Sequence, residues 1–161
     1  MATMTPEQER TINQLNHLIA LNADAAAGFQ SAGQNIKNSE LETLFTGYAR
    51  QHSAFQGELR QECIRLGGNF SDDGTLGGAV HRGWMDLKSA LTGHSASAIL
   101  ASCVSGEESA ERAYADAADA NPTGQTHSLL EKHCQQIKGF RTHLVRLVGQ
   151  TKDGVDFQKN E

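Results

Sequence analysis

Apolar side chains recur every three or four residues through most of this 161-residue chain, and that spacing places them on one face of an α-helix. The pattern predicts four long helices and one short helix. Their expected bounds are residues 6–36, 40–66, 79–91, 97–120 and 124–148, the third range being the short helix. Residues 151–161 are polar and are expected to form a flexible tail behind a single domain over residues 1–150.

Short polar breaks separate the first two long helices and the last two. Thr5 and Pro6 suit the start of the first helix, and Asn38 or Ser39 can cap the second. Residues 121–122, an Asn-Pro pair, separate the last two helices. Because each turn is short, each pair of helices must pack as an antiparallel hairpin.

The connection between the two hairpins is much longer than either turn. It has roughly thirty residues, rich in Gly and Asp at first and amphipathic over residues 79–91, so it can travel the length of a bundle. With such a connection the second and third long helices run parallel. The sequence therefore predicts an all-α, antiparallel four-helix bundle with a short helix in the long crossover, which is the ferritin-like topology.

Composition excludes several classes of protein. Aromatic residues make up 6% of the chain, which counts against a β-sandwich or barrel. The net charge of −5 comes from interspersed residues of both signs, so neither nucleic acid nor a membrane surface is an expected partner. No apolar stretch approaches the roughly 18 residues of a membrane span, and the polar N-terminus does not predict a secretory signal. Cys63, Cys103 and Cys134 are widely spaced and odd in number, as expected for reduced thiols in a cytoplasmic protein.

Ionisable side chains interrupt the apolar faces at one depth of the predicted bundle. At a rise of about 1.5 Å per residue, the expected layer contains Asp24, His52, Glu107 or Glu108, and His143. Carboxylate oxygens and neutral imidazole nitrogens are ligands of Fe, Mn and Zn, so this layer predicts a metal site. No pattern indicates a nucleotide or an organic cofactor. The competing interpretation is a plain buried hydrogen bond between a His and a Glu.

Five further side chains have expected places around this layer. His133 lies roughly two turns lower on the apolar face of the last helix. Tyr48 and Tyr114 either orient metal ligands or fill the core with the hydroxyl at its margin. Trp84 is expected to anchor the short helix on the bundle. His81 is expected to cap that helix or bond a backbone carbonyl, with a role as metal ligand as the weaker alternative.

Several segments resemble a family of small, uncharacterised bacterial ferritin-like proteins. Residues 81–93, HRGWMDLKSALTG, resemble that family's crossover motif, and LIALNADAAAGFQSA in the first helix resembles its opening. The segment Gly106-Glu107-Glu108 before Tyr114 is a weaker match. The resemblance covers residues 15–147 and implies the fold more firmly than a function.

The wider ferritin-like superfamily, which includes ferritins, rubrerythrins and di-iron oxidases, has a recognisable metal pattern. One carboxylate comes from each of two helices, and a Glu-x-x-His motif comes from each of the other two. Here Ala49 stands three residues before His52, and Phe140 stands three residues before His143. The missing glutamates argue against O₂ activation or ferroxidase chemistry and leave a mononuclear, asymmetric or lost site.

Two functions remain open at this point. The first is a metal-binding ferritin-like protein that stores or senses a metal or performs limited redox chemistry. The second is a non-catalytic, stress-related bundle that acts through its surface, for example as a homo-oligomer such as a dimer. A cysteine nucleophile is a weaker third reading, because Cys63 and Cys103 lie on apolar faces and Cys134 lacks a basic cluster. An enzymatic activity is therefore not the expected outcome.

Overall fold

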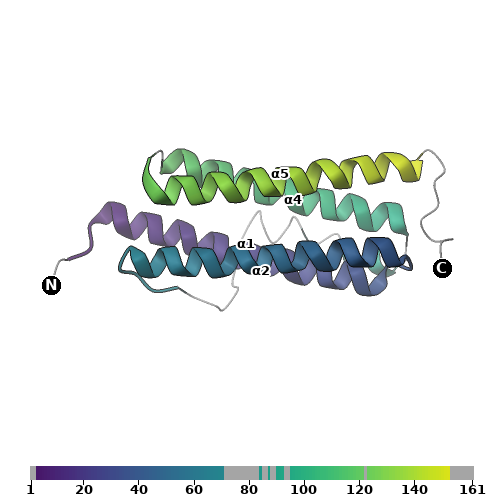
Figure 1. Cartoon of the computed structure of the whole chain (residues 1–161), viewed down its shortest axis with the longest axis horizontal. Coiled ribbons are helices and arrows are strands. Elements are labelled where there is room, and N and C mark those ends of the chain that lie inside the picture. The colour runs from purple at the N-terminus through teal and green to yellow at the C-terminus, as the bar shows by residue number, and fades with distance from the viewer. Residues whose placement is uncertain are drawn as a thin grey trace.

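The computed structural model describes residues 3–70, 84, 87, 90–92, 95–121 and 123–152. Four long helices account for nearly all of these residues (Figure 1). They are α1 (Pro6–Asn35), α2 (Ser39–Arg65), α4 (Ala96–Ala120) and α5 (Gly124–Lys152). Trp84, Leu87 and residues 90–92 are also helical, so the short helix extends at least one residue beyond its predicted end at residue 91, and the other residues predicted for it lie outside the described part of the chain.

The predicted bounds of the four long helices agree with the structure to within one residue except at the end of α5. That helix continues through Thr151 and Lys152, the first two residues of the predicted tail. The Thr151 hydroxyl donates a hydrogen bond of 2.7 Å to the carbonyl of Val148, so the polar side chain supports the last turn. The remainder of the predicted tail lies outside the described residues.

Side-chain caps fix where α1 and α2 begin. At α1, the Thr5 hydroxyl accepts from the Gln8 N–H at 3.1 Å, and the Gln8 carboxamide oxygen accepts from the Thr5 N–H at 2.9 Å. This reciprocal pair is a capping box. At α2 the Asn38 side chain accepts from the Leu41 N–H at 2.9 Å, so Asn38 is the cap and Ser39 is the first helical residue.

A glycine in the left-handed region ends α2. Gly67 has φ of 85°, a conformation that costs other residues about 1 kcal/mol or more. This geometry lets the Gly67 N–H bond the Ile64 carbonyl and the Gly68 N–H bond the Cys63 carbonyl, both at 2.9 Å. The pair of bonds is a Schellman motif, and it turns the chain out of the helix into the crossover.

The helices form two antiparallel hairpins, α1 with α2 and α4 with α5, that pack against each other (Figure 1). Helix α2 ends at one end of the bundle and α4 begins at the other, so these two helices run parallel. This arrangement confirms the predicted crossover topology. No described helix contains a stretch of 18 residues apolar enough to cross a membrane.

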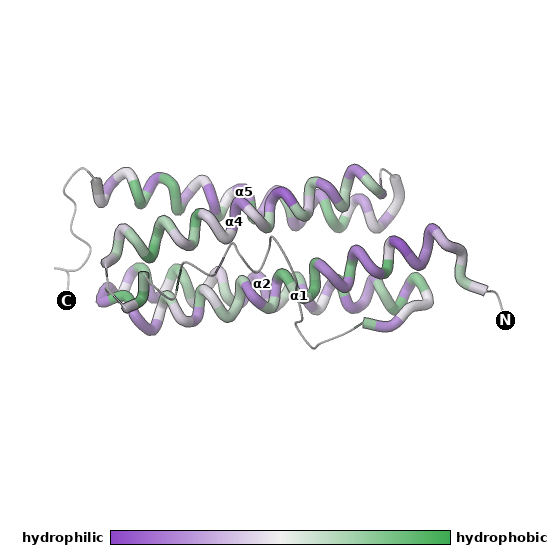
Figure 2. Tube along the Cα trace, turned by 180° about the vertical axis from the view of Figure 1, so that it is seen from behind, coloured by the Kyte–Doolittle hydropathy of each residue, from purple (hydrophilic) through white to green (hydrophobic). Residues whose placement is uncertain are grey.

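The core consists of two apolar clusters, one in each half of the bundle, and Figure 2 shows apolar positions alternating with hydrophilic ones along the long helices. The first cluster includes Leu15, Leu18, Phe55, Leu59 and Ile137. The second includes Phe29, Phe45, Trp84, Leu100 and Leu144. Between them in sequence stand buried polar residues from three helices, namely Asn22, His52 and Glu107.

Trp84, which was predicted to anchor the short helix on the bundle, packs between the two hairpins. Its side chain is 8% exposed and packs edge-on against Phe29, with ring centroids 5.1 Å apart. The indole lies directly over the α-carbons of Gly28 on α1 and Gly106 on α4, where a Cβ atom would overlap it. The two glycines therefore create the slot that the indole fills.

A buried polar chain as the candidate functional site

His52 and Glu107 form a fully buried pair between α2 and α4. His52 Nε2 lies 2.7 Å from Glu107 Oε1, and neither residue is exposed to solvent. The imidazole stacks on Phe29, with ring centroids 5.8 Å apart, and meets Phe55 edge-on at 5.6 Å. Glu107 Oε2 has no hydrogen-bond partner among the described residues. This apolar shell strengthens the bond between the two side chains, because little solvent screens it.

From His52 a chain of hydrogen bonds continues through the interior. His52 Nδ1 lies 2.7 Å from Asn22 Oδ1 on α1, and Asn22 Nδ2 donates to the Tyr114 hydroxyl on α4 at 2.8 Å. Asn22 Nδ2 also donates to the Leu18 carbonyl at 2.8 Å. The Tyr114 hydroxyl lies 2.9 Å from His133 Nδ1 on α5. All four long helices therefore contribute to one buried chain.

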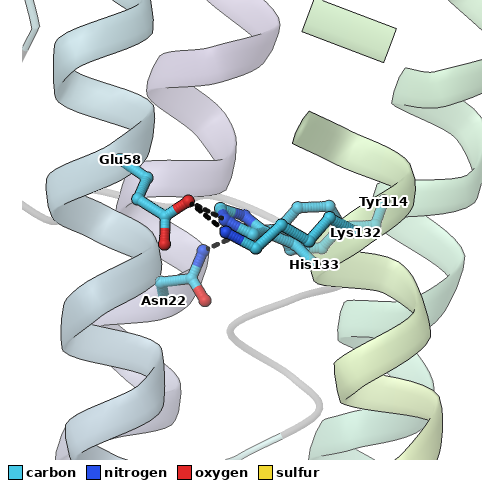
Figure 3. Close-up of polar contacts among 5 residues, drawn as sticks. All are labelled: Asn22, Glu58, Tyr114, Lys132 and His133. Atoms are coloured by element: carbon cyan, nitrogen blue, oxygen red, sulfur yellow. Dashed lines mark hydrogen bonds and ion pairs between the residues drawn. The ribbon is translucent and has the colours of Figure 1, made fainter. Parts of the chain in front are cut away.

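The chain reaches the surface between α2 and α5, where Figure 3 shows His133 pointing at the Glu58 carboxylate. His133 Nε2 lies 3.3 Å from Glu58 Oε2, and Lys132 Nζ lies 3.0 Å from the same oxygen. His133 has no exposed surface, whereas the Glu58 side chain is 38% exposed. Glu58 and Lys132 line a hollow of about 590 Å³ between the two helices. One end of the chain is thus sealed and the other is open to water.

The partners of Asn22 fix the direction of every donor in the chain. The Leu18 carbonyl can only accept, so the atom facing it must be the amide nitrogen, and Asn22 Oδ1 must accept from His52 Nδ1–H. Tyr114 accepts from Asn22 and therefore gives its hydrogen to His133 Nδ1. The neutral His133 ring then carries its proton on Nε2 and donates it to Glu58. All donors from His52 onward point toward the surface.

The inner pair must share one proton. Because His52 Nδ1 carries a hydrogen for Asn22, its Nε2 would present a lone pair to Glu107 Oε1 unless a proton lay between them. At 2.7 Å two acceptor atoms would repel each other. Either a neutral imidazole with a protonated carboxyl or an imidazolium with a carboxylate satisfies this geometry, and both are neutral overall.

Burial is the largest single influence on the pKa values of Tyr114, His133 and Glu58. It raises the pKa of the Tyr114 hydroxyl well above its usual range, so this group remains protonated and able to donate. Burial also lowers the pKa of His133 to about 4, against the opposing effect of Glu58. For Glu58 itself, burial favours the neutral form, but hydrogen bonds from Lys132 and His133 outweigh it and hold the pKa of the carboxyl below its usual range. At neutral pH the chain therefore ends in an uncharged imidazole against a carboxylate.

The structure brings together two of the five predicted metal ligands, His52 and Glu107. Asp24 and His143 are half-buried on α1 and α5, and Glu108 is exposed on α4. Glu108 turns away because successive helical residues are about 100° apart around the axis. Among the described residues, no group of three or more His, Cys, Asp or Glu side chains is placed to hold a metal ion. Predicted residue His81 lies outside the described part of the chain.

Apolar side chains occupy the positions where the di-iron pattern would have its glutamates. Ala49 is 4% exposed and belongs to one apolar cluster. Phe140 packs against Tyr48 with ring centroids 4.4 Å apart and against His52 at 6.0 Å.

Tyr48, which was expected either to orient a ligand or to fill the core, is 8% exposed within the same cluster as Ala49. Its hydroxyl has a pKa raised to about 12, by burial and then by the charge of Glu107.

Sequence reasoning gave no role to Asn22, Glu58 or Lys132. Asn22 is fully buried on the apolar face of α1, and an uncharged amide at such a position is the signal that a hydrogen-bonding partner lies opposite. Glu58 directly precedes a buried leucine of α2 and gave no comparable signal. His133, which was expected roughly two turns below the predicted layer, bonds Tyr114 and Glu58.

The three cysteines are free thiols in the structure. Cys63 and Cys103 are completely buried, and burial raises the pKa of Cys63 to about 11 and moves that of Cys103 further in the same direction. Cys134 is half-buried, and burial raises the pKa of its thiol as well. A nucleophilic cysteine needs a lowered pKa, so these thiols do not support that chemistry.

Comparison with known proteins supports the fold and identifies a family. The bacterioferritin-related protein from Bacteroides fragilis, described as a dodecameric thioferritin, superposes with a TM-score of 0.71 over 92% of this chain and 91% of that chain. The two sequences are 12% identical, so the likeness shows a shared ferritin-like fold. No curated protein matches the sequence. The sequence model of the family described as "Domain of unknown function (DUF2383)" matches residues 10–120, more than half of the sequence, and the chain therefore belongs to the DUF2383 family.

Proposed function

We propose that this protein is a non-catalytic ferritin-like bundle that acts through its surface, and that hydrogen bonds rather than a metal ion satisfy the polar residues of its interior. The observation that carries the proposal is the complete engagement of His52. Its Nδ1 bonds Asn22 and its Nε2 bonds Glu107, both at 2.7 Å. An imidazole coordinates a metal through a free lone pair, and neither nitrogen offers one here.

The surroundings of the pair do not fit an Fe, Mn or Zn ion. Such ions take about four to six ligands, and within the part of the chain that the structure describes no third His, Cys, Asp or Glu side chain joins His52 and Glu107 in a group placed to hold one. The free Glu107 Oε2 is one further donor atom. Phe29, Phe55 and Phe140 pack against the imidazole, and these three side chains offer no metal-binding atom. The relation to a thioferritin at 12% identity supports a common fold and does not supply the missing ligands.

Metal analysis tests this proposal directly. Untagged protein purified from metal-replete cells is expected to contain far less than one equivalent of Fe, Mn or Zn per chain by elemental analysis. Its thermal unfolding midpoint should not change when a chelator is added, because no ligand stabilises the folded state. Stoichiometric metal that disappears in Glu107→Ala, and persists in a control with the exposed His17 replaced by Gln, would refute the proposal.

A surface strip on α4 and α5 suggests how the bundle acts. Small and branched apolar residues line a hollow of about 310 Å³ there, namely Ala101, Val104, Val145, Val148 and Gly149. The Val145 side chain is 46% exposed. Exposed apolar patches mark protein contacts in many monomers, and the similar Bacteroides fragilis protein is described as dodecameric. These observations favour self-association through this strip.

Self-association can be measured with a matched pair of variants. We expect the wild-type protein to sediment as a homo-oligomer at micromolar concentration, and Val145→Asp to shift it to monomer, because a charge in an apolar contact loses its hydration. Ile64→Asp is the control, since Ile64 on α2 is 53% exposed and lies outside the strip. Equal sedimentation of both variants, or a monomeric wild type, would exclude the α4–α5 strip as the contact.

A further inference from the structure

The two hairpins are joined in the interior by three side-chain hydrogen bonds of the buried chain. These are His52 to Glu107 at 2.7 Å, Asn22 to Tyr114 at 2.8 Å, and Glu58 to His133 at 3.3 Å. Each bond has one partner on α1 or α2 and the other on α4 or α5. A change in any member of the chain therefore acts on the contact between the hairpins.

A second proton on His133 creates a conflict that the chain cannot resolve. The imidazolium must donate from Nδ1, so Tyr114 would have to accept where it now donates. Tyr114 cannot redirect its hydrogen to Asn22, because the amide nitrogen faces it. Asn22 in turn cannot flip, because its carbonyl oxygen would then face the Leu18 carbonyl. The Tyr114 hydrogen is left buried without an acceptor, which is unfavourable.

We propose that His133 is an acid-sensitive latch between the two hairpins: when its imidazole takes a second proton, the donor directions conflict at Tyr114 and the hairpins loosen along this contact. Water entering the loosened contact would satisfy both the tyrosine hydroxyl and the imidazolium. The second proton binds Nδ1, because Nε2 already carries a hydrogen, and the Nδ1 lone pair faces the Tyr114 hydroxyl in the interior. Protonation of the ring and opening of this contact are therefore coupled.

The charged and titratable groups around His133 determine the sign of the effect. Glu58 and His52 face it from α2, Tyr114 from α4, and Lys132 from its own helix, while α1 contributes the uncharged Asn22 amide through Tyr114. Burial lowers the pKa of His133 to about 4, below the ordinary value of about 6.5. His133 therefore binds the proton more tightly when the hairpins are separated than when they are docked. The docked state begins to lose stability as the pH falls below the ordinary histidine pKa of about 6.5, and the loss is complete near the lowered pKa of about 4.

Trp84 provides a built-in reporter for this motion. It is the only tryptophan of the chain, and its indole lies between Gly28 of one hairpin and Gly106 of the other. Loosening should expose the indole and shift its emission to longer wavelength, while the helices themselves persist. Fluorescence and far-ultraviolet circular dichroism, recorded together, therefore separate loosening of the hairpins from unfolding.

The test is a titration from pH 7.5 to pH 4. In the wild type we expect a red shift of Trp84 emission at nearly constant helix content, with a midpoint shared by the imidazole resonances of His133 in NMR spectra. His133→Gln should lose the transition, whereas His17→Gln on the exposed face of α1 should retain it. Glu58→Gln removes the anion that favours the imidazolium, so the midpoint should move down by about 1 pH unit.

Three results would overturn the latch. One is Trp84 emission that stays constant to pH 4 in the wild type. Another is an unchanged transition in both His133→Gln and Glu58→Gln. The third is a His133 titration whose midpoint differs from that of the fluorescence change. Because Glu58→Gln alters a partly exposed side chain, it keeps the test decisive even if His133→Gln does not fold.

Discussion

Replacing Glu107 by leucine is expected to destabilise the folded protein by about 3 kcal/mol. The substitution leaves His52 Nε2, which is fully buried, without its partner at 2.7 Å. No other described side chain is hydrogen-bonded to that nitrogen, so the desolvation cost of the imidazole is no longer offset. Chemical denaturation at pH 7 measures the change in the free energy of unfolding.

Two variants sharpen this result. In Glu107→Gln the side-chain amide can donate to His52 Nε2, so we expect a smaller loss of about 1 kcal/mol. Glu108→Leu alters the neighbouring glutamate, which is exposed, and should change stability by less than about 0.5 kcal/mol. If Glu107→Leu and Glu108→Leu destabilised the protein equally, the buried pair would have no special contribution.

The second large effect is expected at the Trp84 slot. Trp84→Ala removes a nearly buried indole and should cost about 3–5 kcal/mol. Gly106→Ala keeps the indole but places a methyl group where its ring atoms lie, and should cost about 1–3 kcal/mol. Gly28→Ala should behave similarly, because the other side of the same ring lies over that α-carbon.

Gly47→Ala is the matched control for the slot. Gly47 is an exposed residue within α2, and a Cβ added there meets nothing within 4 Å. The substitution should stabilise the protein by about 0.5–1 kcal/mol, since alanine favours the helix more than glycine does. A Gly106→Ala variant as stable as Gly47→Ala would show that the indole does not need the space beneath it.

The sequence predicts the helices and their topology well, because both depend on local signals. Apolar spacing over more than twenty residues defines each helical face, and caps such as Thr5 and the break at Gly67 define the ends. The order of the helices in space follows from two short turns and one long crossover. None of these inferences requires knowledge of which side chains meet across the bundle.

The contacts between helices depend on relative depth, which the sequence specifies poorly. Counting residues placed His143 level with His52, whereas the α5 side chain that reaches the His52 ring is Phe140, three residues earlier. That error is nearly one helical turn, about 5 Å along the axis. The same uncertainty hid the bond between Glu58 and His133. The predicted ligand Glu108 fails for a different reason, its angular position on α4, which leaves it exposed.

The polar chain also determines which helix pairings the protein tolerates. Asn22 bonds His52 within one hairpin, and Tyr114 bonds His133 within the other. Each hairpin also has polar groups whose partners lie on the other hairpin, as in the bond from Asn22 to Tyr114. Two copies of the same hairpin, or two hairpins displaced by one turn, would bury these groups without partners. An apolar interior would accept such exchanges at little cost. Here the buried polar groups favour one alignment of the two hairpins, because a misaligned or domain-swapped bundle would bury them without partners and be less stable.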